Sequence, residues 1–137
     1  VGSEMCIRDS YHARLHGLPD QRVDEVLDAV DMRERADDPV RSLSRGMVQR
    51  LAVCRAVLHS PQLLLLDEPR ANLDPAAAEL TEPLIGRAAQ VTRVLTSHDP
   101  DAALAEADLV LGLKTGRAAL RGEPGQINPT QVRELYA

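Results

Sequence analysis

Apolar residues in the first part of the chain recur at the spacing of a helix. In residues 21–30 they fall at i, i+3, i+4 and i+7, on one helix face. These positions are Val23, Val26, Leu27 and Val30. Asp20 precedes this segment as a favoured capping residue, and Ser44 does the same for a longer helix in GMVQRLAVCRAVLHS. A charged connector, RERADDPVRS, separates them and is broken by Pro39. The first part is therefore expected to be all helix.

The pattern changes after Pro61. The run QLLLLDEP is apolar without interruption, has the length of a strand and lies between two prolines. Continuous rather than alternating hydrophobicity predicts a strand covered on both faces, as in a parallel sheet. A second strand is expected within VTRVLTSHD. An Asp-Pro pair follows each strand, at Asp74 and Asp99. Both pairs predict helix starts, because Asp is a good cap and Pro suits the first helical position.

The last part of the chain predicts a strand pair and a short helix. DLVLGLKTGRAALRG reads as two strands that turn at residues 114–116, and Asn128 is expected to cap a terminal helix in PTQVRELYA. The order of elements in the second half is then β-α-β-α-β. This order predicts an α/β layer architecture.

Composition narrows the class of protein. The chain has 137 residues with two Tyr, no Trp and no Phe, so its core must consist of aliphatic side chains. A net charge of -5, with arginines scattered among acids, argues against a nucleic-acid partner. No apolar run approaches the ~20 residues that span a bilayer. The two cysteines, Cys6 and Cys54, form no disulfide framework, which favours a reducing cytosol.

Candidate chemistry lies at the ends of the two predicted strands. Asp67 and Glu68 end the first and His98 follows the second, at the edge where open α/β sheets bind ligands. One carboxylate can hold a divalent cation while its neighbour orients or deprotonates a water. A nearby His can contact the developing charge on a phosphate. An Asp-Glu pair taken alone most often merely ends a strand.

The segment LSRGMVQR offers a second candidate. Ser44 would cap the helix, and Gly46 would let a phosphate approach the exposed N–H groups at its positive end. A capping Ser with a nearby Gly is also ordinary helix initiation. The order of the features is more informative: a capped helix, a buried strand, the Asp-Glu pair, then a strand followed by His.

This order resembles the ABC-type ATPases, the nucleotide-binding subunits of ABC transporters. LSRGM resembles the signature motif LSGGQ, LLLLDEP resembles Walker B, ANLD the D-loop and TSHD the switch-histidine loop. The likeness covers residues 11 to about 122. Arg45 and Met47 replace the second Gly and the Gln of the signature, and Arg70 stands where Thr is usual.

The resemblance implies a fold and a set of domains. The fold would be that of a P-loop NTPase, with part of the helical subdomain at residues 11–59 and the C-terminal part of the ATPase core at residues 60–137. A phosphate-binding loop, G-x-x-x-x-G-K-[ST], is not found in the chain, so its strand is expected to be missing. The chain is then a C-terminal fragment that should not hydrolyse ATP alone and should expose apolar strand edges.

The resemblance also implies roles for the motif residues. Asp67 would help to hold Mg²⁺, Glu68 would be the general base, and His98 would contact the γ-phosphate of ATP. The signature would bind ATP held by a partner subunit, and Asp74 would link the two sites across the dimer. The signature residues in question are Ser44, Arg45, Gly46 and Met47.

Partners and location follow from the same likeness. A second ATPase subunit, identical or different, would sandwich ATP, and a membrane permease would bind the helical subdomain. The protein would lie in the cytoplasm, on the inner face of the cell membrane. YHARLHGL followed by LSRGM resembles drug- and haem-export ATPases. Two alternatives stay open: a non-transport ABC-type ATPase, disfavoured by the lack of a heptad run, and a non-catalytic regulatory or binding fragment, disfavoured by an intact Glu68 and His98.

The opening stretch VGSEMCIRDS is needed by none of these motifs. Reverse translation gives ten codons that resemble a transposase-type sequencing adapter. Residues 1–10 are therefore predicted to be a non-native peptide fused to a gene fragment.

Overall fold

The computed structural model describes residues 11–136 and divides them into two compact units, the first ending at Thr96 and the second beginning at Ser97. The predicted non-native peptide, residues 1–10, lies outside the described residues. The first unit contains α2 (Asp20–Asp28), η1 (Arg33–Arg35), η2 (Val40–Ser42), α3 (Arg45–Val57), β1 (Leu63–Leu66), α4 (Pro75–Ile85), η3 (Arg87–Ala89) and β2 (Thr92–Leu95). The second contains α5 (Pro100–Glu106), β3 (Val110–Lys114), β4 (Arg117–Gly122), η4 (Pro124–Gln126) and α6 (Pro129–Tyr136).

The helical prediction for the first part is confirmed, with one wrong cap. Pro19 rather than Asp20 occupies the N-cap of α2, and no side chain caps this helix. An N-cap residue has a non-helical backbone, and Pro19 is extended, at φ -69° and ψ 150°. The helix therefore begins at Asp20, one residue earlier than predicted. There the Asp20 carboxylate still faces the positive end of the helix dipole. Ser44 is the N-cap of α3 as predicted, because its Oγ accepts a hydrogen bond from the Met47 N–H at 3.2 Å.

The connector between these helices is more ordered than its charge pattern predicts. It forms the short helices η1 and η2, which begin on either side of Pro39. Arg33 in η1 makes ion pairs back to α2, at 3.0 Å to Asp24 and 3.5 Å to Asp28. These contacts hold the exposed connector against the helix that precedes it.

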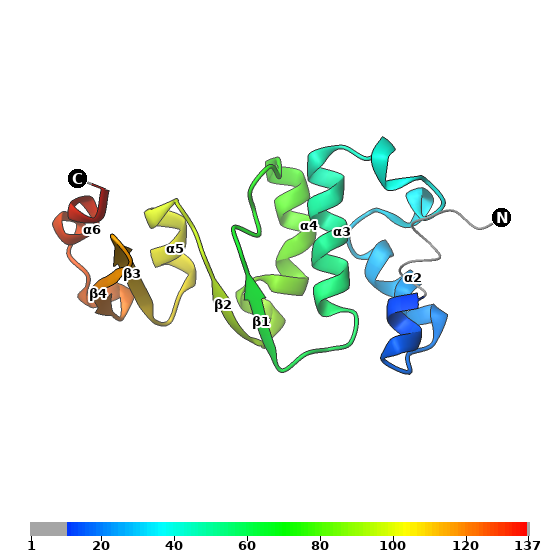
Figure 1. Ribbon diagram of the computed structural model, residues 1–137, viewed down its shortest axis with the longest axis horizontal. Coiled ribbons are helices and arrows are strands. Elements are labelled where there is room, and N and C mark those ends of the chain that lie inside the picture. Colours follow the sequence, from blue (N-terminus) through cyan, green and yellow to red (C-terminus); the bar gives the residue numbers. More distant parts are fainter. Residues whose placement is uncertain (1–10, 137) are drawn as a thin grey trace. The chain divides into compact units, whose positions relative to one another are not determined.

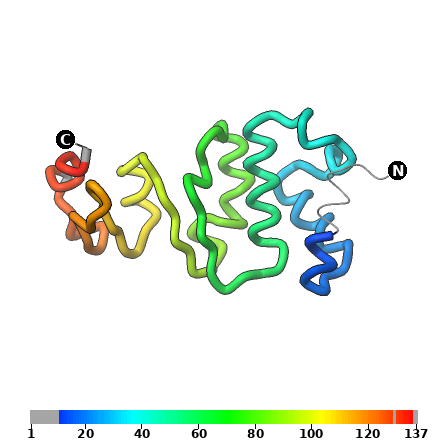
Figure 2. Tube along the Cα trace, in the orientation of Figure 1, coloured from blue at the N-terminus to red at the C-terminus, as the bar shows by residue number. Residues whose placement is uncertain are grey.

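The core of the first unit is aliphatic, as the composition requires. It joins α2 and α3 to β1 and to the end of α4, and Met32 and Leu51 are among its most buried side chains. Cys54 is a small residue of this core: its side chain is buried and its Sγ lies 3.1 Å from the Val26 carbonyl oxygen. Helices α3 and α4 pack side by side next to β1 (Figures 1 and 2).

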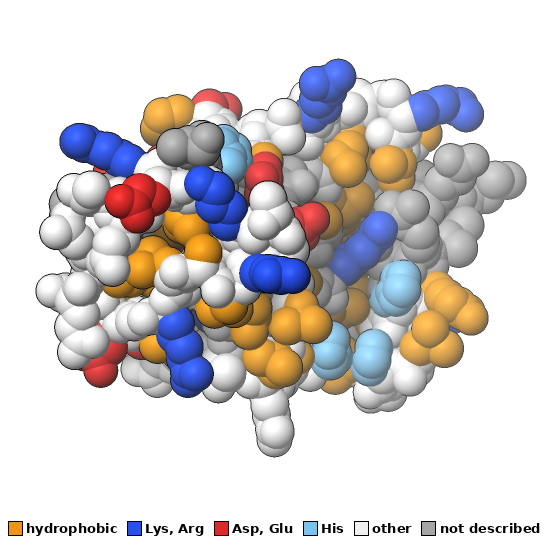
Figure 3. All heavy atoms as spheres, turned by 60° about the vertical axis from the view of Figure 1, so that its left-hand side comes forward, with side chains coloured by type: hydrophobic (Ala, Val, Ile, Leu, Met, Phe, Trp, Pro, Cys, Tyr) orange, Lys and Arg blue, Asp and Glu red, His pale blue; other side chains and the backbone are white. Residues whose placement is uncertain are grey.

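Strands β1 and β2 form a parallel pair, which confirms the predicted parallel sheet, in register from Leu63 with Thr92 to Leu66 with Leu95. The prediction that both faces are covered is wrong for the described chain. Leu64 and Leu66 are buried, whereas Leu65 is 73% exposed. Successive side chains of a strand point to opposite faces, and the core helices cover only one of them. On the face that Figure 3 draws, hydrophobic side chains are exposed among charged ones.

The second unit is built on an antiparallel hairpin. Strands β3 and β4 pair through the predicted turn, where Thr115 and Gly116 both have positive φ. Helix α6 packs on β3 at Gly112, where a Cβ atom would lie 2.6 Å from a methyl group of Leu135. The predicted cap of α6 is confirmed, because the Asn128 side chain accepts a hydrogen bond from the Thr130 N–H at 2.8 Å. The third predicted strand thus belongs to a separate sheet.

The helices of residues 11–136 are short. The longest helix that lies wholly within this range is α3, which has 13 residues. None of the helices described combines the length and the apolar character that a bilayer crossing requires.

Burial on β1 predicts opposite responses at two neighbouring leucines. Leu64→Ala should lower the free energy of unfolding of the 137-residue chain by about 2–4 kcal/mol, because it opens a cavity in the core. Leu65→Ala should change it by no more than about 0.5 kcal/mol, because this side chain is already exposed to water. Urea unfolding measures both, and each variant is the matched control for the other. Equal losses would show that the outer face is covered in solution.

Candidate functional site

One hydroxyl group organises the ends of the parallel strands. The register sets Leu66 opposite Leu95, so Asp67 and Thr96 leave the sheet side by side. Thr96 Oγ1 donates a hydrogen bond to Asp67 Oδ1 at 2.5 Å and accepts one from the Glu68 N–H at 3.0 Å. The Thr96 N–H also donates to the Leu66 carbonyl at 2.9 Å. The two predicted carboxylate residues are therefore held by a single residue of the neighbouring strand.

The backbone at Glu68 has an uncommon conformation. Its φ is +43°, in the left-handed region that residues other than Gly rarely adopt. Such a conformation is kept only where the surrounding structure enforces it. Here the Glu68 N–H is bound by Thr96 and the Glu68 carbonyl accepts from the Ala71 N–H at 2.9 Å. The Glu68 side chain itself is exposed.

The loop after β1 packs against the start of α3. Gln49 on α3 donates from Nε2 to the Pro69 carbonyl at 3.0 Å. A Cβ atom at Gly46 would lie 3.1 Å from the Asn72 carbonyl oxygen, closer than most such contacts allow. Asn72 has φ +62°, a left-handed conformation that Asn tolerates better than most residues. Gly46 therefore has a packing reason to be glycine, since the loop lies directly against it.

The other signature residues lie next to Gly46 at the start of α3. Ser44 and Arg45 are exposed at the N-terminus of α3. Met47 is half-buried, and its side chain packs against the core. The structure thus brings the signature segment together with the loop that follows the two carboxylates.

Asp74 and His98 lie at the starts of helices. Asp74 caps α4, where its Oδ1 accepts from the Ala77 N–H at 2.8 Å, so the predicted capping role is confirmed. His98 lies in the second unit, exposed, in the turn before α5. This turn is held by Ser97, whose hydroxyl accepts from the Asp99 N–H at 3.0 Å, while Asp99 is the predicted cap of α5.

The remaining histidines make contacts with other rings. The rings of His16 and His59 stack with their centroids 4.4 Å apart and their planes at 11°. His12 meets Tyr11 edge to face. Within residues 11–136, no group of three or more His, Cys, Asp or Glu side chains is placed to hold a metal ion. Asp67 is accordingly not part of a complete metal cage made by the described protein.

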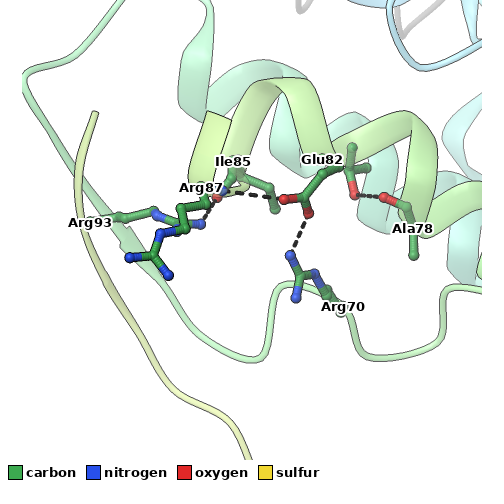
Figure 4. Close-up of polar contacts among 7 residues, drawn as sticks. Arg70, Ala78, Glu82, Ile85, Arg87 and Arg93 are labelled. Carbon is green, nitrogen blue, oxygen red and sulfur yellow. Dashed lines mark hydrogen bonds and ion pairs between the residues drawn. The ribbon is translucent and has the colours of Figure 1, made fainter. Parts of the chain in front are cut away.

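Several contacts at the site were not predicted from the sequence. The resemblance of TSHD to the switch-histidine loop gives Thr96 no role, although its place directly after a strand that neighbours β1 indicates one. No local sequence signal predicts the contact of Gln49 with the loop or the partner of Arg70. Figure 4 shows that partner: the Arg70 guanidinium reaches the carboxylate of Glu82 on α4, at 2.5 Å.

The hydroxyl of Thr96 offers a direct test of this arrangement. Thr96→Val keeps the shape of the side chain but removes both hydrogen bonds, so unfolding should become easier by about 0.5–1.5 kcal/mol. Thr96→Ser keeps the hydroxyl and should stay closer to the original stability. Chemical unfolding of the 137-residue chain measures both variants. A Val variant as stable as the Ser variant would show that the hydroxyl does not hold the loop.

Several known proteins resemble this chain in sequence. A family model described as ABC transporter matches residues 3–71, half of the chain, and this range overlaps the predicted non-native segment. Phosphonates import ATP-binding protein PhnC 2 of Cupriavidus metallidurans is 34% identical over 82% of this chain and 41% of its own length. Cobalt import ATP-binding protein CbiO of Rhodobacter capsulatus is 42% identical over 74% of this chain and 37% of its own.

A solved structure agrees at the level of the fold. The ATP-binding subunit of an ABC transporter superposes with a TM-score of 0.82 and 21% identity, over 100% of this chain and 65% of that one. The chain spans about half the length, or less, of the curated relatives above. Both relatives are import proteins, so they give no support to the predicted likeness to drug and haem exporters. The predicted P-loop NTPase fold is confirmed, and the chain belongs to the ABC transporter family, as a portion of an ATP-binding domain.

Proposed function

We propose that this chain is part of a subunit that hydrolyses ATP and couples hydrolysis to transport through a membrane permease. The observation that carries the proposal is the strand-end arrangement in which Thr96 holds both Asp67 and Glu68. It is joined by the contact of the same loop with the signature segment at Gly46. In a member of the ABC transporter family, this combination favours a hydrolytic site.

Glu68 is the proposed general base. Its carboxylate is exposed, so a water molecule can reach it, while two backbone hydrogen bonds fix the residue. Glu68 would take a proton from the water that attacks the terminal phosphate, and the hydrogen bond from Thr96 would keep Asp67 in a separate role. Fixed placement of a base is what makes general base catalysis effective.

Asp67 is the proposed protein ligand for Mg²⁺. A site with a single available carboxylate fits this ion, which in nucleotide sites keeps several waters and uses one or two carboxylates together with the substrate phosphates. The exposed carboxylate of Asp67, oriented by Thr96, matches that donor set. When bound, the ion would neutralise charge on the phosphates of ATP.

The start of α3 is the proposed contact with ATP held by a second ATPase subunit. The N-terminus of this helix of 13 residues carries partial positive charge, and Arg45 adds a full charge on the exposed first turn. Ser44 would contribute its hydroxyl, Gly46 an unobstructed backbone, and Met47 the N–H that it already offers to Ser44. Asp74, at the end of the loop that follows β1, would contact the ATP site of the second ATPase subunit.

The other proposals follow from the family. His98, exposed before α5, would contact the γ-phosphate. The second ATPase subunit would be a copy of this chain or a relative, and the assembly would work on the cytoplasmic side of the membrane, bound to its permease.

Import is the favoured direction of transport because both curated relatives above serve import systems. Their cargoes, phosphonates and cobalt, are too unlike to name the cargo of this protein.

Glu68→Gln in the full-length protein tests the assignment of the base. The amide keeps the size of the side chain but accepts no proton, so kcat for ATP hydrolysis should fall by about 10²- to 10⁴-fold. ATP binding should persist, because binding does not need a base. Phosphate release and nucleotide-binding titrations measure the two effects. Glu79→Gln, at an exposed glutamate on α4, is the matched control and should keep its turnover. Undiminished hydrolysis by Glu68→Gln would remove Glu68 from this role.

A further inference from the structure

We infer that Arg70 and Glu82 form a positioning pair that fixes the loop from Asp67 to Asp74 against α4. This inference rests on the proposed function, because the loop carries the proposed base and the proposed Mg²⁺ ligand. Arg70 is one of the residues at which the sequence departs from the family motifs, and the hydrolytic chemistry above gives it no task. Its guanidinium meets the Glu82 carboxylate at 2.5 Å.

The Glu82 carboxylate is held in place for this contact from its other side. Its Oε1 accepts a hydrogen bond from the Arg87 N–H at 3.2 Å, which leaves Oε2 for Arg70 (Figure 4). The side chain folds over Gly86, where an added Cβ atom would lie 2.0 Å from the carboxylate carbon. Glycine at position 86 is therefore what allows Glu82 to take this orientation.

Helix α4 is a firm support for the loop. Asp74 caps its first turn, and at its last turn the Ile85 carbonyl accepts a hydrogen bond from the guanidinium of Arg93 on β2. At the preceding residue of the loop, Gln49 of α3 donates a hydrogen bond to the Pro69 carbonyl. Consecutive residues, Pro69 and Arg70, are thus tied to α3 and α4 respectively.

The loop needs such ties because its backbone is strained. Both Glu68 and Asn72, on either side of Pro69 and Arg70, have left-handed φ values. The Arg70–Glu82 pair itself is about 36% and 45% exposed, so it adds little to global stability. Its effect is expected on the placement of the loop rather than on the folding of the chain.

The test is a double-mutant cycle in the full-length protein with Arg70→Ala, Glu82→Gln and both together. Each single variant should lower kcat for ATP hydrolysis by roughly three- to tenfold, below the ~10²-fold cost of misplacing a reacting group by about 1 Å. The KM for ATP should stay unchanged. The double variant should be no worse than either single one, because both remove the same contact. Hydrogen exchange of the loop amides should become faster in all three.

Arg33→Ala is the matched control, because it removes two ion pairs between η1 and α2 that are about as exposed and lie away from the loop. It should leave kcat and loop exchange unchanged. The proposed pair would be overturned if Arg70→Ala kept the kcat and the loop-amide exchange rate of the wild type. It would also be overturned if the losses in kcat of the two single variants added up in the double variant. A wild-type protein without ATP hydrolysis would instead overturn the proposed function, and loop exchange would then decide on the pair alone.

Discussion

The parallel pairing of β1 with β2 is the constraint on which the site depends. Two strands far apart in the chain are held side by side, in a register that brings Asp67 next to Thr96. From that register follow the hydrogen bonds that fix Asp67 and the Glu68 backbone. A shift of one residue would turn every side chain of the strand to the other face and would move these groups apart. The buried pair Leu64 and Leu66 opposes such a shift.

The same loop connects the carboxylates with the start of α3. Gly46 faces the Asn72 carbonyl closely enough that a larger residue would push the loop away. A glycine that the sequence indicates for phosphate approach therefore also serves packing within one chain. This contact joins the signature segment to the loop after β1, since a movement of the loop would disturb the N-terminus of α3. Arg70 and Glu82 extend the connection to α4.

The aliphatic core explains why the sheet is open on one side. Leu64 and Leu66 belong to one buried cluster with side chains of α2, α3 and α4, while Leu65 and Val94 remain exposed on the other face. A continuous apolar run is typical of strands buried on both sides. The sequence of β1 therefore matches a more complete sheet than the described residues form. This agrees with a chain that spans about half, or less, of its curated relatives.

Local chemistry determined much of this protein from the sequence alone. Helix starts at Ser44, Asp74 and Asp99, the apolar run of β1 and the family motifs all depend on residues close together in the chain. Local pattern did not indicate that Thr96 bonds to Asp67, that Gly46 abuts Asn72, or that Arg70 finds Glu82. These contacts join residues 12 to 29 positions apart. Only packing of the strands and helices brings such residues within bonding distance, so the tertiary structure alone decided how the candidate site is held.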